Sequence, residues 1–70
     1  MIDFTTLTLG DFYKIRYETG ERMRGGTIQG PLTRIWTPEE HRAGHWQGQI
    51  NNGWCFHEED TVVEHREPTP

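Results

Sequence analysis

Cysteine, hydrophobic residues and lysine are scarce in this 70-residue chain, and each scarcity restricts the class of protein. Cys55 is the only cysteine, so no disulfide can form within one chain, and a single free thiol favours a reducing cytoplasm over secretion. No apolar run approaches the roughly 20 residues that a membrane helix needs. The N-terminus carries Asp3 and no basic region, so we predict no signal peptide. We therefore expect a cytoplasmic protein without a membrane segment.

The low apolar content also limits the hydrophobic core. Hydrophobic residues make up 31% of the chain, although three Trp, three Phe and two Tyr each carry a large side chain. A chain of this length forms one domain and buries roughly 60% of its unfolded surface. Thin cores are often completed by a metal or a second chain, so a homodimer is one expectation.

The charge is mildly acidic and unevenly distributed. The formal net charge is -4, from 7 basic and 11 acidic residues, which argues against a general nucleic-acid-binding protein. Six of the seven basic residues are Arg, a usage that favours a high-GC bacterium or one of its phages. Several Arg lie in the middle of the chain, whereas acidic residues gather near its end at Glu58, Glu59, Asp60, Glu64 and Glu67.

The first half of the chain predicts a strand followed by a long loop. Apolar residues and Thr alternate over residues 1–9, which indicates an edge strand or a tail whose Phe4 docks on the fold. Residues 12–17 form the clearest strand, with Tyr13, Ile15 and Tyr17 toward the core and the two tyrosine hydroxyls reaching outward. Residues 18–26 form a polar loop with three glycines. It is either a mobile connection or a contact tip made of Arg22, Met23 and Arg24; that choice stays open.

The middle of the chain predicts two extended pieces, at residues 27–30 and 32–36, separated by Pro31. Proline cannot donate a backbone hydrogen bond, so we expect a bulge or an edge position there. Thr37 and Glu40 have the spacing of a capping box around Pro38, which predicts one short helical turn over residues 38–42.

The last third predicts a hairpin, a turn and a final short strand. Residues 45–50 alternate polar and apolar side chains, and Gly48 on the apolar face indicates a bulge or a close approach of backbone. Asn51-Asn52-Gly53 supplies the tight turn, after which Trp54 and Phe56 share one face. Residues 58–60 predict an exposed, solvated 3₁₀ turn, and residues 61–63 a strand. Residues 1–65 then make up one domain, and residues 66–70 a disordered tail.

This ending resembles that of SH3 domains. The residues that carry the resemblance are Trp46-Gln47-Gly48, Asn52-Gly53, Phe56 and Val62-Val63. It implies an all-β, SH3-like barrel of five to six strands; another small barrel, such as an OB-like one, is the alternative. The Pro and Tyr that build the proline-peptide groove of signalling SH3 domains are missing between Phe56 and Val62. The resemblance therefore implies the fold and not proline-peptide binding.

Catalytic and metal chemistry have weak support in the sequence. Cys55 and His57 share a strand face, but a nucleophile also needs a cleft and an orienting group, so we favour a half-buried structural cysteine. His41 and His45, with Cys55 and His57, supply zinc-ligand types. Gly44 interrupts the helical spacing, and Cys-x-His is not a usual zinc motif. We expect no enzyme, no cofactor and no metal, with a small enzyme or metalloprotein centred on these four residues as the minor alternative.

The best-supported functional signal is the surplus of tryptophan together with arginine, because both residue types are enriched at binding hot spots. The candidate binding residues are Arg22, Arg24, Arg34, Trp36, Arg42, His45, Trp46 and Trp54. The sequence favours a non-enzymatic protein-interaction module, such as a phage or mobile-element accessory protein that binds a host or self-encoded protein. The alternative is a nucleic-acid-binding barrel that uses the Arg residues and an exposed Trp.

Overall fold

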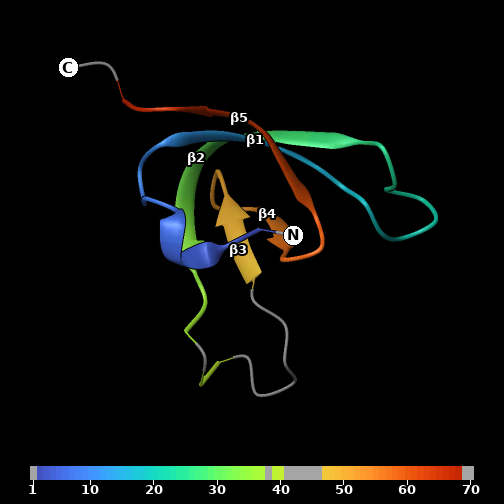
Figure 1. The fold of residues 1–70 in the computed structure, drawn as a ribbon, viewed down its shortest axis with the longest axis horizontal. Helices are drawn as coiled ribbons and strands as arrows, with labels where there is room; N and C mark the ends of the chain where they lie inside the picture. The colour runs from blue at the N-terminus through green and yellow to red at the C-terminus, as the bar shows by residue number, and fades with distance from the viewer. Residues whose placement is uncertain (1, 38, 41–46, 69–70) are drawn as a thin grey trace.

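The computed structural model describes residues 2–37, 39–40 and 47–68. Within them, five strands form one antiparallel sheet in the order β4-β3-β2-β1-β5 (Figure 1), which confirms the predicted all-β class. The elements are η1 (Phe4–Thr6), β1 (Phe12–Arg16), β2 (Thr27–Ile35), β3 (Gln47–Ile50), β4 (Trp54–His57) and β5 (Thr61–Arg66). No helix in these residues is long and apolar enough to cross a membrane.

Strand β2 joins the two halves of the sheet. Its first part, residues 27–31, pairs with β1, and its second part pairs with β3. The two extended pieces expected from the sequence are therefore one strand, with Pro31 inside it and opposite Phe12. A register shift follows between Leu32 and Arg34, next to the proline, as the missing donor predicts.

The N-terminal segment docks on the sheet and forms no edge strand. Asp3 caps the 3₁₀ helix η1, because its carboxylate accepts the Thr5 backbone N–H at 3.0 Å. Phe4 is buried and its ring stacks on that of Phe56, with 5.6 Å between centroids. Of the two alternatives for this segment, the docked Phe4 is confirmed.

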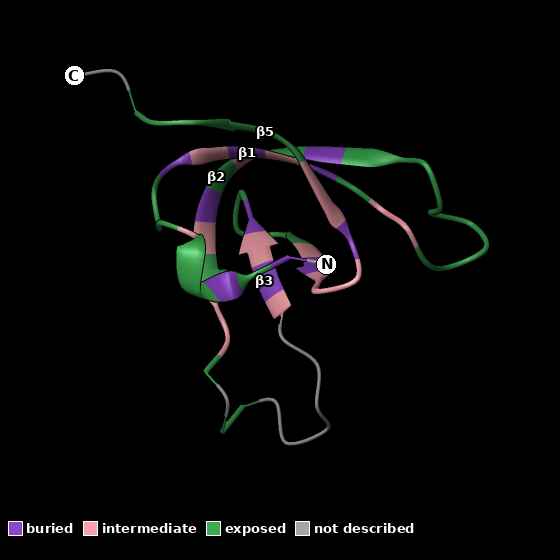
Figure 2. Ribbon diagram, in the orientation of Figure 1, coloured by how far each residue is buried: buried purple, intermediate pink, exposed green. Residues whose placement is uncertain are grey.

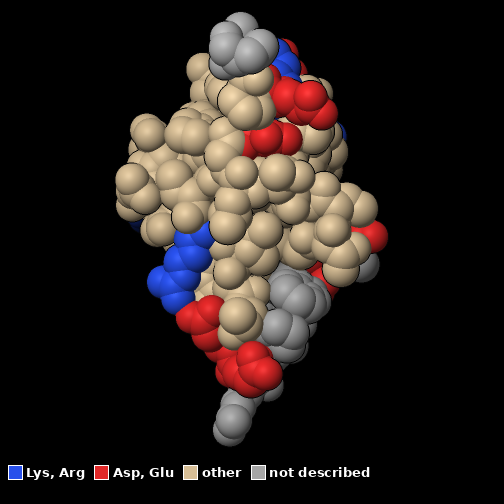
Figure 3. Space-filling model, turned by 90° about the vertical axis from the view of Figure 1, so that its left-hand side faces the viewer, with Lys and Arg blue, Asp and Glu red and all other residues tan. Residues whose placement is uncertain are grey.

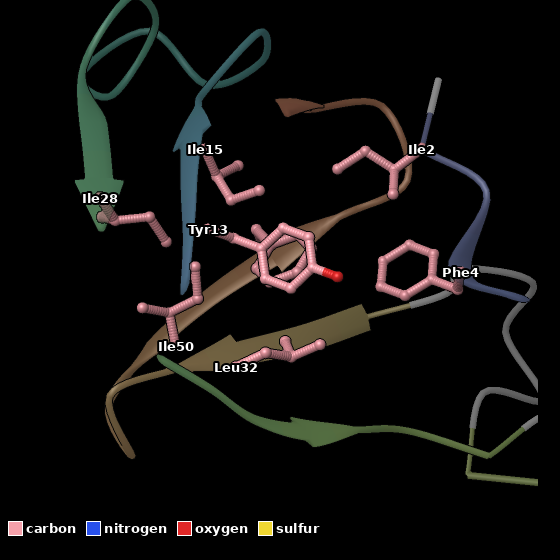
Figure 4. Close-up of a cluster of buried hydrophobic side chains, with 8 residues drawn as sticks. Ile2, Phe4, Tyr13, Ile15, Ile28, Leu32 and Ile50 are labelled. Atoms are coloured by element: carbon pink, nitrogen blue, oxygen red, sulfur yellow. The ribbon is translucent and has the colours of Figure 1, made fainter. Parts of the chain in front are cut away.

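Eight buried side chains make up the core: Ile2, Phe4, Tyr13, Ile15, Ile28, Leu32, Ile50 and Phe56. Figure 4 shows side chains from the N-terminal segment and several strands pointing toward one another, and Figure 2 shows that the outer part of β5 is exposed. Tyr13 and Ile15 face the core as predicted, and Tyr17 packs against it half-buried. The Tyr13 hydroxyl accepts the Thr8 backbone N–H at 2.9 Å, so it is bonded within the fold and does not reach into solvent.

The β3–β4 hairpin follows its sequence closely. Asn51 and Asn52 have φ values of 53° and 60°, the positive angles that a tight hairpin turn requires. Gly48 lies opposite Phe56, and a Cβ atom at Gly48 would lie 2.5 Å from the Phe56 ring. The predicted close approach at Gly48 is therefore present, although the approaching group is an aromatic ring and not backbone.

Strand β5 is longer than predicted. It runs to Arg66, a residue that was expected in a disordered tail. Lys14 and Ile15 of β1 are opposite Glu64 and Val62, which leaves Val63 as an extra residue at a register shift. Such a bulge turns the extra side chain away from the ladder, and Val63 is exposed.

Three side-chain contacts hold the end of β5 against β1. His65 Nε2 lies 2.8 Å from Oδ2 of the buried Asp11, and the His65 ring stacks on Tyr13 at 4.3 Å between centroids. The Arg66 guanidinium lies 4.1 Å from the centroid of the Phe12 ring. Each of these contacts joins residues more than 50 positions apart, so a local periodicity pattern cannot predict them. For this reason the sequence places the start of the disordered tail at residue 66, inside β5.

The acidic turn before β5 differs from the prediction in the burial of one residue. Asp60 was expected on an exposed 3₁₀ turn, but it is only 1% exposed, and the structure has a simple turn there. Its carboxylate accepts the backbone N–H of Glu18 at 3.0 Å and that of His57 at 2.9 Å. One backbone donor on each carboxylate oxygen satisfies this buried side chain, which serves as a structural acceptor.

Candidate binding pocket

An open pocket of about 420 Å³ lies between the loop of residues 17–26, the start of β2 and the start of β4. We call it the Met23–Trp54 pocket. Its lining is Tyr17, Arg22, Met23, Gly26, Thr27, Ile28, Gln29 and Trp54. The volume is at the small end of the range for ligand pockets, roughly 300–1,000 Å³, and suits one or two side chains of a partner. In Figure 1 the loop connects the end of β1 to the start of β2 and projects beyond the sheet.

Internal hydrogen bonds shape the loop. The backbone N–H groups of Met23 and Arg24 donate to the Gly20 carbonyl, at 3.2 and 2.9 Å. Gly20 and Gly25 have φ values of 86° and 82°, which glycine adopts without the steric cost that other residues carry. This folding places Arg22 and Met23 on the pocket lining, so two of the three residues of the proposed contact tip line one concavity.

The base of the loop is attached to β4 and to the turn that leads into β5. The Tyr17 hydroxyl donates to the Cys55 carbonyl of β4 at 2.8 Å. One residue later, the Glu18 backbone N–H donates to Asp60, and the Thr61 hydroxyl donates to the Glu18 carboxylate at 2.9 Å. These bonds connect positions about forty residues apart, so they fix where the loop stands relative to β4.

Two exposed apolar side chains form the walls of the pocket. Trp54 is 53% exposed and Met23 is 45% exposed, and both are among the few large hydrophobic residues that the described structure leaves in solvent. Trp54 shares a strand face with Phe56, as the sequence indicates, yet Phe56 is 0% exposed. Trp54 begins β4, next to the turn, so its side chain lies at the margin of the core, where it lines the pocket.

The lining has a single positive charge. Burial, followed by the nearby Asp60 and Cys55, raises the pKa of Tyr17, so its phenol is neutral at pH 7. Among the described lining residues, Arg22 is then the one that is charged at neutral pH, and it pairs with no acid of the described chain. An unpaired guanidinium beside apolar walls can recognise a carboxylate through charge-assisted hydrogen bonds.

A second group of predicted residues lies elsewhere and is engaged internally. The Arg34 guanidinium pairs with the Glu40 carboxylate and lies 4.2 Å from the centroid of the Trp36 ring. The predicted capping box is present, because Glu40 accepts the Thr37 backbone N–H at 2.9 Å, and this bond is the main reason that the pKa of Glu40 is lowered. Figure 3 shows basic and acidic side chains adjoining at the lower end of the molecule, below a wide uncharged area.

The remaining candidates divide between residues outside the described structure and residues with a structural role. Arg42, His45, Trp46, His41 and most of the expected helical turn at residues 38–42 lie outside the described residues. Cys55 is half-buried, and its sulfur lies 3.9 Å from Gln49 Nε2. The described residues contain no group of three or more His, Cys, Asp or Glu side chains that could hold a metal.

The structure thus brings Arg22 and Trp54 to one pocket and places Arg34 with Trp36 in another group. Arg24 belongs to the same loop but does not line the pocket. Sequence reasoning missed Tyr17 as a lining residue, because it assigned Tyr17 to the core, and it gave no role to Thr27, Ile28 and Gln29 of β2. The alternation over residues 12–17 gave Tyr17 a core-facing position, and the side chain packs half-buried against the core. No local pattern shows that Tyr17 also lines a pocket with the loop that follows it.

Comparison with known proteins found no match: neither a protein-family model nor a curated protein nor a solved structure corresponds to this chain.

Proposed function

We propose that this chain is a non-enzymatic protein-interaction module, and that the Met23–Trp54 pocket receives an apolar side chain of the partner. The observation that carries the proposal is the joint exposure of Trp54 and Met23 on one open concavity. Trp is the residue type most typical of binding hot spots, and Met adapts its shape to different apolar partners. In so small a core, leaving these two side chains in water forgoes hydrophobic stabilisation, which a partner can recover.

The way the pocket is built supports binding over a purely structural role. The loop has its own backbone hydrogen bonds, and Tyr17 and Glu18 attach its base to β4 and Asp60. A site that is already arranged loses less conformational entropy when a partner binds. Scattered single hydrophobic residues on a surface need no explanation, but two that line one pocket fit a docking site.

An SH3-like architecture remains part of this proposal. The strand order, in which β5 returns to pair with β1, and the division of β2 between β1 and β3 support it. The pocket adjoins the long loop between β1 and β2, whose length and position resemble those of the long RT-type loop of SH3-like barrels. We infer a similar use of the loop with a different peptide chemistry, because the proline-binding residues are absent from the sequence.

The test is a selection of random peptide segments displayed within a carrier protein, on immobilised wild-type chain and on two variants. Wild type should enrich segments that contain a large apolar residue, and Trp54→Ala should abolish the enrichment. Leu9→Ala is the matched control, because Leu9 is 58% exposed and apolar but lies outside the pocket. Circular dichroism of each variant checks that the fold is retained.

Two results would overturn the proposal. Equal enrichment by wild type and Trp54→Ala would show that the pocket does not take the apolar side chain. Quenching of tryptophan fluorescence by single-stranded DNA in the wild type but not in Trp54→Ala, with affinity that falls steeply as salt rises, would favour the nucleic-acid alternative, since each phosphate contact releases counterions.

A further inference from the structure

We infer that the partner segment carries an aspartate or glutamate side chain next to its apolar residue, and that Arg22 recognises this carboxylate. The inference rests on the proposed function and adds the chemistry of the partner. Arg22 and Met23 are neighbours in the chain and both line the pocket. A segment whose apolar side chain contacts Met23 therefore brings its adjacent residues within reach of the guanidinium, since residues of an extended chain rise by about 3.3 Å each.

The charges around the pocket leave Arg22 available. Glu18, the acid at the base of the loop, lies 2.7 Å from Arg16 and also accepts the Thr61 hydroxyl. The hydrogen bond from Arg16 is the main cause of the lowered pKa of Glu18, so this carboxylate is ionised and already partnered at neutral pH. Glu21 precedes Arg22 in sequence but forms no ion pair within the described residues and does not line the pocket.

A single carboxylate fits this site better than a polyanion does. Arg22 supplies one guanidinium, which matches one carboxylate with two parallel hydrogen bonds. A nucleic acid needs several cations along its backbone, and the chain as a whole has a net charge of -4. The local positive charge on an acidic protein therefore selects a small, isolated acidic group, and it disfavours lysine or arginine beside the apolar anchor.

Polar side chains on β2 complete the recognition surface. Thr27 and Gln29 are exposed and belong to the lining. Their hydroxyl and amide groups can form hydrogen bonds with the backbone of an extended partner segment. Apolar walls, one cation and two neutral hydrogen-bonding groups give the mixture of a buried anchor and a polar rim that peptide sites use.

The experiment uses three capped peptides built on one sequence enriched in the selection, with Glu, Gln or Lys next to the apolar residue. Acetylated and amidated ends remove terminal charges, and a fourth peptide with Gln and a free carboxyl terminus tests the other source of a carboxylate. Dissociation constants are measured by amide NMR shifts at low ionic strength. For the wild type we expect the Glu peptide to bind about two- to fivefold more tightly than the Gln peptide, as an exposed ion pair does.

Charge reversal gives the decisive comparison. Arg22→Glu should invert the preference, so that the Lys peptide binds more tightly than the Glu peptide. Arg24→Glu is the matched control, because it makes the same charge change in the same loop outside the pocket lining, and it should preserve the order. A preference that Arg24→Glu shifts as strongly as Arg22→Glu would show only a general field effect and would overturn the inference.

The remaining outcomes separate this inference from the function on which it rests. If the three capped peptides bind equally while Trp54→Ala still abolishes binding, the pocket is a peptide site and the acidic specificity is wrong. Tighter binding of the free-carboxyl peptide than of the Glu peptide would also overturn the inference, because the recognised group would then be a chain terminus. If none of the selected sequences depends on Trp54, the proposed function itself fails.

Discussion

Replacing Gly48 by alanine tests the tightest packing contact in the fold. A Cβ atom at this position would lie 2.5 and 2.8 Å from two carbon atoms of the Phe56 ring, and 3.2 Å from the Phe4 ring. Phe56 is 0% exposed and stacked on Phe4 with 13° between the ring planes, so neither ring can move without disturbing the other. A clash under 3.0 Å therefore has to be relieved by displacing the core.

The expected cost follows from two opposing effects. Inserting a methyl group into a packed core costs about 1–3 kcal/mol, whereas replacing glycine by alanine lowers the entropy of the unfolded chain and returns about 0.4–1 kcal/mol. We expect Gly48→Ala to lower the free energy of unfolding by about 1–2 kcal/mol. A chain of this size has a total stability of roughly 3–10 kcal/mol. The corresponding fall in Tm is about 4–16 °C.

Urea and thermal denaturation, followed by tryptophan fluorescence, measure the effect against a matched control. Gly53→Ala makes the same substitution in the adjacent turn, where the nearest atom to the added Cβ is 3.9 Å away, and it should be neutral or slightly stabilising. A Gly48→Ala variant as stable as Gly53→Ala would refute the close approach of the Phe56 ring. In a Phe56→Leu background, Gly48→Ala should be less costly, because the smaller side chain leaves room for the methyl group.

Two further predictions concern the contacts at the base of the loop. Asp60→Ala removes the acceptor of two backbone N–H groups, of Glu18 and His57, and should cost about 2–4 kcal/mol in urea denaturation, whereas Glu58→Ala in the same turn should cost far less. The raised pKa of Tyr17 means that folding favours the neutral phenol. Its contribution to stability is thus complete below about pH 10 and is lost as pH rises through the raised pKa. Tyr17→Phe should flatten this alkaline loss, and an unchanged pH profile between pH 9 and 12 would contradict the assignment.

Local sequence signals predicted the elements whose geometry depends on neighbouring residues. The alternation of Tyr13 and Ile15 identified β1 and its buried face, and Asn51-Asn52 identified the hairpin turn with its positive φ angles. Gly48 within the β3 pattern indicated that another group approaches the strand closely, and that group is the Phe56 ring. Each of these signals is decided by backbone sterics or by side-chain period, which a short stretch of sequence contains in full.

The errors came from contacts between distant parts of the chain. Three acids in a row indicate a solvated turn, but Asp60 is buried because backbone donors from β4 and from the loop after β1 reach its carboxylate. The end of β5 looked like a tail, yet Asp11 and the aromatic rings of β1 hold it. The same limit applies to the pocket: Arg22 and Trp54 were both candidates, but nothing local states that they line one concavity, whereas Arg34 and Trp36 engage each other.

The contacts that position the pocket also protect an edge of the sheet. Strand β4 is at one end of the strand order, so the outward backbone groups of its residues need partners other than a strand. The Tyr17 hydroxyl bonds the Cys55 carbonyl, and the Asp60 carboxylate bonds the His57 N–H. Tyr17 and Asp60 also help to attach the loop of residues 17–26, together with the bond between Thr61 and Glu18. Losing either one should therefore weaken peptide binding and expose the β4 edge together, whereas loss of Trp54 should affect binding alone.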